Sequence, residues 1–197
     1  EPCARRGAAP GAAPRRAHVP ASIGDAMLGV VSAPVLVLGL GNPILTDDGI
    51  GVLVAEAVRN AIPRDAAVEV EEVSVGGLAL MERMVSYPRV LIVDAILTGS
   101  VPAGTVSRLT LDDLGNIGPT RHSNSPHNAS LIAALELARR AGMPLPEEVV
   151  FIAVEVANVL DFSEQQTTAV AAALPCAFRA AMAELERWGA LRPAGVS

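Results

Sequence analysis

Three residues, Asp48, Asp94 and His127, have side chains that can bind a metal and stand where predicted strands and helices meet. Two carboxylates and an imidazole suit a borderline divalent ion such as nickel, zinc, iron or manganese, and three protein ligands leave positions open for water or a substrate. A metal held there could polarise a carbonyl and lower the pKa of bound water. The three residues are far apart in the sequence, so this interpretation requires a fold that brings them together.

Asp48 belongs to a glycine-rich segment, residues 39–51, with the sequence GLGNPILTDDGIG. The apolar run before it, Val35 to Leu38, is typical of a strand buried on both faces, and the apolar residues after it recur at helical spacing. The segment therefore joins the carboxyl end of a strand to the start of a helix. Open α/β sheets place their ligands at such positions.

Two common nucleotide-binding motifs do not fit this segment. The dinucleotide motif G-x-G-x-x-G needs its third glycine where Ile44 stands, and Pro43 lacks an amide that could contact a pyrophosphate. The P-loop needs a lysine, and the chain contains none. The segment is thus better explained as a tight turn that places Asp47 and Asp48 at the mouth of a crevice.

Asp94 and His127 occupy comparable boundaries. The apolar run over residues 89–93 predicts a buried strand, and Asp94 follows at its carboxyl end. A long loop, residues 112–126, contains glycine and proline and leads to His127 at the start of a helix predicted over residues 128–141. All three candidate ligands are therefore expected at the same edge of the sheet.

Simpler interpretations remain open for each of these side chains. Asp47 or Asp48 could cap the helix that begins near Gly49, with Asp47 the nearer candidate for a cap, and Asp94 could cap a turn. His127 could be an exposed residue at a helix start. Two other polar residues are less informative: His122 is expected to be a solvated loop residue, and Glu155, at a strand end, could support the site from behind or lie on the surface.

The order of predicted elements is strand, helix, strand, helix, strand, hairpin, helix, strand, helix. This alternation predicts a three-layer α/β/α sandwich with a mostly parallel, mixed sheet. Besides the elements above, we expect strands over residues 65–75 and 149–156, a helix over 77–86, an antiparallel edge strand over 105–109 and a C-terminal helix over 163–188 that is interrupted at Pro175.

The 197-residue chain is long enough for one domain of ordinary size. We expect this domain over residues 34–190, after a disordered extension over residues 1–33 that is rich in Ala, Pro, Gly and Arg, and before a short tail over residues 191–197. Met27 lies shortly before the first predicted strand and could be the true start of the protein.

The composition excludes several classes of function. The net charge of −6 and the lack of a basic stripe argue against a nucleic-acid partner. Two cysteines, Cys3 and Cys176, are too few for a disulfide framework, so a reducing cytoplasm is the expected location. No apolar run approaches the roughly 20 residues needed to cross a bilayer, and we expect no membrane insertion.

Several motifs resemble those of the hydrogenase maturation proteases, over about residues 34–185. They are GLGN at residues 39–42, DDGIG at 47–51, Val93-Asp94-Ala95 after the buried strand, PAGTV at 102–106, Ser125-Pro126-His127 before a helix, and Phe162-Ser163 followed by AAALP at 171–175. The first motif and the order of the three candidate ligands are the most specific of these.

The resemblance implies an endopeptidase, a metal-dependent hydrolase that works through aspartate and histidine, with a phosphorylase/hydrolase-like fold. Its substrate would be the large-subunit precursor of a nickel-iron hydrogenase, from which it removes the C-terminal extension after nickel insertion. The metal-contacting residues of the family fall on Asp48, Asp94 and His127, where Asp48 replaces the glutamate that is often found. The nickel would be supplied by the precursor, and no organic cofactor is implied.

Two alternatives remain open. A noncatalytic docking protein could use the same crevice to hold a partner's C-terminal peptide, and a metal-independent hydrolase could share the fold. The segment GLGNP at residues 39–43 also resembles the beginning of peptidyl-tRNA hydrolases, and Thr120-Arg121-His122 resembles part of their histidine motif. That likeness is shallow, because Ile44 replaces a glycine, Ser123 intervenes before Asn124, and the acidic chain is unsuited to tRNA.

Overall fold

The computed structural model describes residues 5–6, 35–116 and 126–191, without the side chains of residues 5–6, 115–116 and 126–129. Its central feature is a mixed sheet of order β1-β5-β6-β4-β2-β3. The strands are β1 (Arg5–Arg6), β2 (Val35–Leu40), β3 (Val68–Val73), β4 (Arg89–Ile96), β5 (Val106–Thr110) and β6 (Glu148–Glu155). Among the pairings of these described strands, only that of β5 with β6 is antiparallel.

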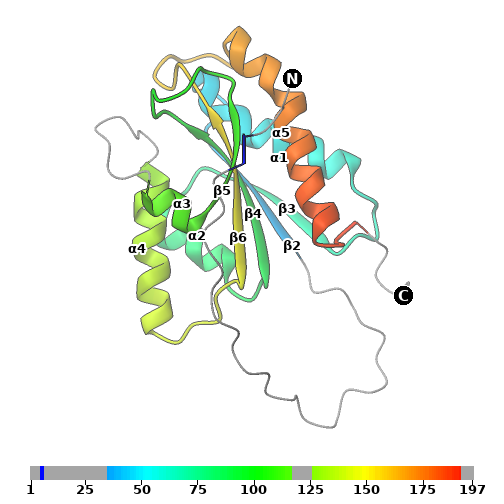
Figure 1. Cartoon of the computed structure of the whole chain (residues 1–197), viewed down its shortest axis with the longest axis vertical. Helices are drawn as coiled ribbons and strands as arrows, with labels where there is room; N and C mark the ends of the chain where they lie inside the picture. The colour runs from blue at the N-terminus through cyan, green and yellow to red at the C-terminus, as the bar shows by residue number, and fades with distance from the viewer. Residues whose placement is uncertain (1–4, 7–34, 117–125, 192–197) are drawn as a thin grey trace.

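Helices cover both faces of this sheet. Figure 1 shows α2, α3 and α4 on one side and α1 and α5 on the other. The α/β/α sandwich with a mostly parallel sheet, predicted from the sequence, is therefore confirmed. The helices are η1 (Thr46–Gly49), α1 (Ile50–Ala61), α2 (Gly77–Met84), α3 (Leu111–Asn116), α4 (Pro126–Arg140) and α5 (Thr168–Arg187).

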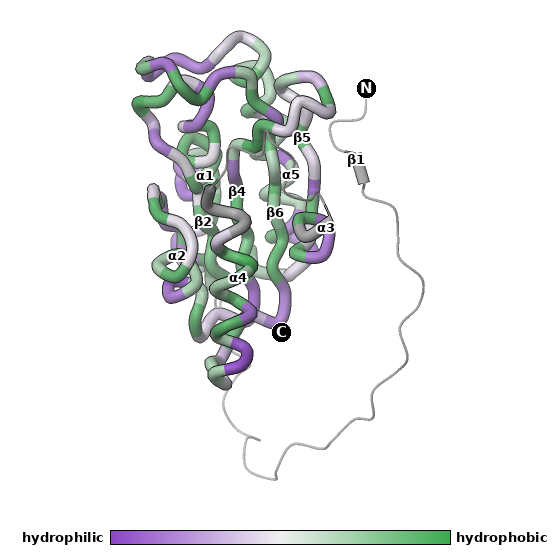
Figure 2. The backbone as a smooth tube through the Cα atoms, turned by 90° about the vertical axis from the view of Figure 1, so that its left-hand side faces the viewer, coloured by the Kyte–Doolittle hydropathy of each residue, from purple (hydrophilic) through white to green (hydrophobic). Residues whose placement is uncertain are grey.

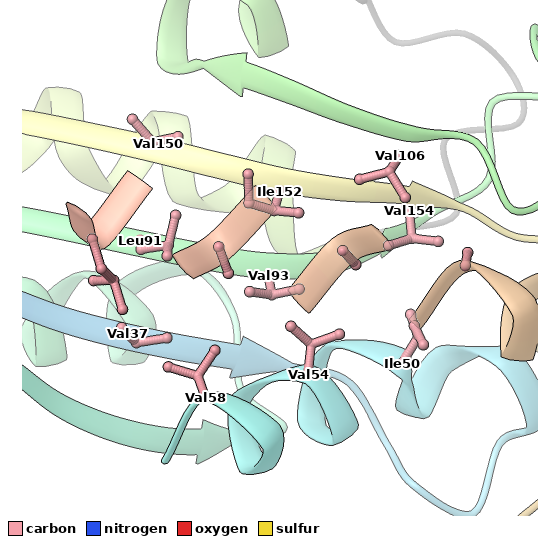
Figure 3. Close-up of a cluster of buried hydrophobic side chains, with 14 of the residues drawn as sticks. Val37, Ile50, Val54, Val58, Leu91, Val93, Val106, Val150, Ile152 and Val154 are labelled. Atoms are coloured by element: carbon pink, nitrogen blue, oxygen red, sulfur yellow. The ribbon is translucent and has the colours of Figure 1, made fainter. Parts of the chain in front are cut away.

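The central strands bury both faces because nearly every residue in them is apolar, as Figure 2 shows for β2, β4 and β6. In β2, Val35 and Val37 face α1 and α5, whereas Leu36 and Leu38 face α2 and α4. Figure 3 shows the first of these two cores, where valines of the sheet, with Leu91 and Ile152, meet one side of α1. The alternation follows from the two-residue period of a strand.

Several element boundaries differ from the sequence-based expectation, including that of α4, which begins at Pro126 rather than at residue 128. β4 continues to Ile96, so Asp94 lies inside the strand, paired with Ala153, rather than after its end. The segment 112–116, expected in a loop, belongs to the short helix α3. α5 begins at Thr168 instead of residue 163 and runs through Pro175 without interruption, because its packing outweighs the one hydrogen bond that proline cannot donate.

The expected domain boundaries fall largely outside the described residues. Most of residues 1–33 and 192–197 is not described, and the start at Met27 also lies there. Arg5–Arg6 is the exception, because this pair forms the strand β1 beside Ser107 and Arg108 of β5. The extent of the N-terminal extension therefore stays a prediction.

Among the described helices, α5 is long and apolar enough to cross a membrane by length and composition, a feature that we did not expect from the sequence. In the fold, its apolar residues at helical spacing belong to the core between the sheet and α1. Its C-terminal end also carries Glu184, a buried residue that accepts hydrogen bonds from Arg108 and Arg187. Burial raises the pKa of this carboxyl, but the two guanidinium groups outweigh that effect and lower it.

Two glycines set the distance between α1 and the sheet. A Cβ on Gly51 would lie 2.2 Å from the carbonyl oxygen of Leu40 and 2.5 Å from that of Val93. A Cβ on Gly39 would lie 2.5 Å from the carbonyl oxygen of Gly51. A Cβ on Gly39 would also lie 2.5 Å from the Cβ of Ala55. Backbone atoms and a Cβ cannot rotate away, so only glycine lets the first turn of α1 pack against β2 and β4 this closely.

We predict that Gly51→Ala destabilises the protein by about 1–3 kcal/mol, because α1 must move away from the sheet. Helix propensity alone would change stability in the opposite direction by roughly 1 kcal/mol, so the sign of the effect is informative. Urea denaturation measures the free energy of unfolding. The control is Glu56→Ala on the exposed face of α1, expected within about 0.5 kcal/mol of wild type, and equal stability of Gly51→Ala and wild type would contradict the close packing.

Candidate functional site

The site is built on the turn between β2 and α1, whose backbone leaves little room for substitution. Gly41 has φ +135°, and a Cβ there would lie 1.9 Å from the carbonyl oxygen of Asp48. Thr46 has φ +35°, which is costly for a β-branched residue. Its hydroxyl donates to the carbonyl of Asp161 at 2.6 Å and its N–H to that of Ser163 at 2.8 Å. These bonds hold the strained turn in place.

Asp47 joins this turn to the start of α5. Its side chain is wholly buried and accepts four hydrogen bonds. The N–H groups of Ala157 and Asn158 donate at 3.1 and 3.0 Å, and the N–H and hydroxyl of Thr167 donate at 2.7 and 3.0 Å. Asp47 therefore does not cap α1, as one interpretation of the sequence held. It fixes the loop before α5 instead.

Asp48 is the accessible carboxylate of the pair. Its side chain is partly exposed, and its Oδ2 accepts the N–H of Asn42 at 2.6 Å across the turn. Within the described residues, no hydrogen bond to its other oxygen, Oδ1, is found. No side-chain bond from either aspartate caps the N-terminus of α1. The turn thus orients Asp48 at the carboxyl end of β2 while Asp47 stays inside.

Asp94 lies deeper in the same edge of the sheet. It is 2% exposed and occupies β4, the strand beside β2. In β4, Val90 and Ile92 face α2 and α4, so the two-residue period places Asp94 on that same face. Asp48 follows the end of β2 and Asp94 lies near the end of β4, and therefore both carboxylates belong to the carboxyl edge of adjacent parallel strands.

His127 is the second residue of α4, and its side chain lies outside the part of the chain that the structure describes. The backbone still places it. A Cβ on Gly77, at the start of α2, would lie 3.2 Å from Cβ of Ser130, so the first turns of α2 and α4 are neighbours. α2 follows β3 and begins at the carboxyl edge of the sheet, and α4 begins there too (Figure 1). The fold thus brings all three predicted residues to one edge.

No group of three His, Cys, Asp or Glu side chains that could hold a metal is found among the described residues, and the predicted group includes the undescribed imidazole of His127. His122 likewise falls outside the described residues. The assignment of Asp48, Asp94 and His127 as metal contacts therefore stays a prediction.

Glu155 is not a surface acid, as one interpretation allowed. It is 2% exposed, and its carboxylate accepts the N–H groups of Thr98 and Gly99 at 2.8 and 2.7 Å and the hydroxyl of Thr98 at 2.8 Å. It holds the turn that follows β4, just beyond Asp94. Glu155 thus supports the carboxyl edge from behind.

The sequence analysis missed two residues that shape the site. Thr167 contacts Asp47 through both its backbone and its hydroxyl, and the side chain of Asn158 accepts the N–H groups of Leu160 and Asp161. For Asn158 the residue type gave a signal, because asparagine in a turn commonly accepts backbone amides. Thr167 makes no side-chain cap bond at the start of α5, and its hydroxyl donates to Asp47 instead. Which carboxylate Thr167 would meet could not be read from positions 120 residues apart.

A family model described as hydrogenase maturation protease matches residues 52–184. The chain belongs to this family. The resemblance seen in the sequence is therefore confirmed, and the protein is a protease of hydrogenase maturation.

Individual relatives agree with this assignment. The hydrogenase 2 maturation protease of Escherichia coli is 30% identical over 122 residues, which cover 61% of this chain and 71% of that protein. The hydrogenase expression/formation protein HupD of Rhizobium leguminosarum is 29% identical over 174 residues, 86% of this chain and 85% of that protein. The solved structure of the Escherichia coli hydrogenase maturating endopeptidase HybD matches with a TM-score of 0.68 and 28% identity, over 79% of this chain and 94% of HybD.

We predict that Asp47→Asn lowers the free energy of unfolding by about 2–3 kcal/mol, because an amide nitrogen replaces one acceptor oxygen of a fully buried side chain that accepts four hydrogen bonds. The matched control is Asp48→Asn, which is partly exposed, accepts one described hydrogen bond and should cost under about 1 kcal/mol. Chemical denaturation of both variants measures the difference. Equal losses from the two substitutions would show that Asp47 does not anchor the turn.

Proposed function

We propose that this protein is an endopeptidase that removes the C-terminal extension of a nickel-iron hydrogenase large-subunit precursor after nickel insertion. In this proposal, Asp48, Asp94 and His127 contact the nickel that the precursor carries, and the nickel is part of the substrate. The observation that carries the proposal is the placement of the three residues, on β2's turn, β4 and α4, at one edge of the sheet. Family membership supports the peptidase activity.

The chemistry of the three side chains fits such a substrate. Carboxylate oxygen and imidazole nitrogen are ligands that nickel accepts. Asp48 is partly exposed and uses one oxygen, Oδ2, within the turn, which supports a role for Oδ1 toward the incoming metal. Asp94 is nearly buried, so it would meet a group that enters the crevice rather than one that rests on its surface. A precursor lacking nickel would lack the ion that these carboxylates are proposed to contact.

Recognition of the metal would place the scissile peptide bond beside the site, and water is the proposed nucleophile. Hydrolysis adds hydroxide to the peptide carbonyl carbon and a proton to the departing nitrogen. The residues of this chain contribute by fixing the precursor close to that bond, an effect that can lower the barrier substantially. Gly41, Thr46 and Asp47 contribute indirectly, because they hold the turn that carries Asp48.

The test combines the purified protein with a nickel-loaded precursor and measures the precursor mass over time by mass spectrometry. We expect release of the C-terminal extension by wild type. Asp94→Asn and His127→Ala should each slow release at least about 100-fold, since each loses several kcal/mol of metal contact. Glu136→Ala, on the exposed part of the helix that carries His127, is the control and should match wild type.

Two results would contradict the proposal in different ways. Wild-type rates for Asp94→Asn or His127→Ala would remove the assignment of these residues. Equal cleavage of a nickel-free precursor would remove nickel recognition while leaving the peptidase activity. A precursor that binds without any change in mass would favour the noncatalytic docking protein that the sequence left open.

A further inference from the structure

Large apolar side chains are exposed on the turn that carries Asp48 and on the loop bonded to it. Ile44 is 48% exposed, Leu160 is 76% exposed and Phe162 is 82% exposed. The chain has only three phenylalanines, and leaving one almost fully in water forfeits the stabilisation that burial would give. Single exposed apolar residues are ordinary, but a contiguous group of them marks an interaction site.

These side chains come from two segments that the backbone joins. Leu45 and Ser163 form an isolated parallel bridge, in which Ser163 N–H donates to the carbonyl of Ile44 at 3.0 Å and Thr46 N–H to that of Ser163 at 2.8 Å. Ile44 and Phe162 precede the bridged pair by one residue each, so they are neighbours on the same face of the bridge. We call Ile44, Leu160 and Phe162 the Phe162 surface.

The Phe162 surface is held rigidly next to the candidate site. Asp47 binds the loop before Leu160 through the N–H groups of Ala157 and Asn158, and it is the sequence neighbour of Asp48. The Thr46 hydroxyl binds the carbonyl of Asp161, between Leu160 and Phe162. A molecule seated on this surface would therefore lie at a fixed position relative to Asp48.

The charged residues in the two segments that form the surface are all acidic. Residues 41–49 and 156–167 contain the acids Asp47, Asp48, Asp161 and Glu164 and no Arg or Lys. Asp161 and Glu164 are exposed, and neither forms an ion pair within the described residues. Five of the described arginines lie instead in the last turns of helices that begin at the carboxyl edge: Arg59, Arg83, Arg139, Arg140 and Arg187.

We infer that the Phe162 surface docks the stretch of the hydrogenase precursor next to the scissile bond, and that this stretch carries apolar side chains beside Lys or Arg. The inference rests on the proposed function. Apolar contact with Phe162 and Leu160 supplies binding energy, as exposed aromatic anchors do in interfaces. The acids Asp161 and Glu164 complement a basic segment and speed its approach. A second copy of this chain is a poor occupant, because its own surface has the same negative charge.

The experiment measures the dissociation constant of the nickel-loaded precursor by isothermal titration calorimetry, separately from the rate of cleavage. Phe162→Ser and Leu160→Ser should each raise this constant about tenfold or more, whereas Leu137→Ser should leave it within about twofold of wild type. Leu137 is a matched control because it is 62% exposed on α4 and lies outside the Phe162 surface. All three sites are exposed, so near-ultraviolet circular dichroism should show unchanged folding.

The charge complementarity is tested with salt. Raising sodium chloride from about 50 to 300 mM should weaken binding of the precursor to wild type, and the double variant D161N/E164Q should bind the precursor more weakly and respond less to salt.

Wild-type affinity for Phe162→Ser, or no precursor binding by wild type, would overturn the inference. Loss of a dimer in Phe162→Ser, seen by sedimentation with precursor affinity unchanged, would assign the surface to self-association instead. If the variants lose affinity for the precursor as expected but wild type cleaves no precursor, only the proposed function would be overturned.

Discussion

The buried carboxylate of Asp47 is the interaction on which the arrangement of the candidate site depends. A charged group with no exposure is stable only when hydrogen bonds replace its water, and four donors from residues 157–167 do so here. The same bonds satisfy backbone N–H groups before and at the start of α5. The hydrogen bonds of this one side chain thus replace its lost hydration and also attach a loop to a turn more than 100 residues earlier.

This attachment explains how a strained turn can persist. Thr46 adopts a left-handed backbone conformation that costs on the order of 1–3 kcal/mol, and such conformations survive when the surroundings determine them. Ser163 and Asp161 hold Thr46 from one side, and Gly41 allows the backbone of Asp48 to approach from the other. The two adjacent aspartates therefore differ. Asp47 is buried and accepts four hydrogen bonds, whereas Asp48 is partly exposed.

The fold was predictable because its signals are local. Apolar runs identified β2, β4 and β6, and the alternation of strands and helices indicated the sandwich. The roles of the acids were harder to predict, because they depend on contacts between distant segments. The sequence could not show that Asp47 would bind Thr167 or that Glu155 would hold Thr98 and Gly99. The predicted position of Asp94, after the end of its strand, was also wrong, because β4 continues two residues past it.

Asp47, Asp48 and Asp94 differ in depth at this edge, and the difference bears on what each can do. Asp47 is fully buried and both its oxygens accept hydrogen bonds from the protein, so its role is to stabilise the fold. Asp94 is nearly buried within a strand, where only a group that penetrates the edge could reach it. Asp48 is held by one oxygen in the turn and can present the other outward. A ligand approaching this edge would therefore meet Asp48 before Asp94. Because the exposed Phe162 adjoins the same turn through the bridge of Leu45 with Ser163, a polypeptide that reached Asp48 would also have an apolar surface beside it.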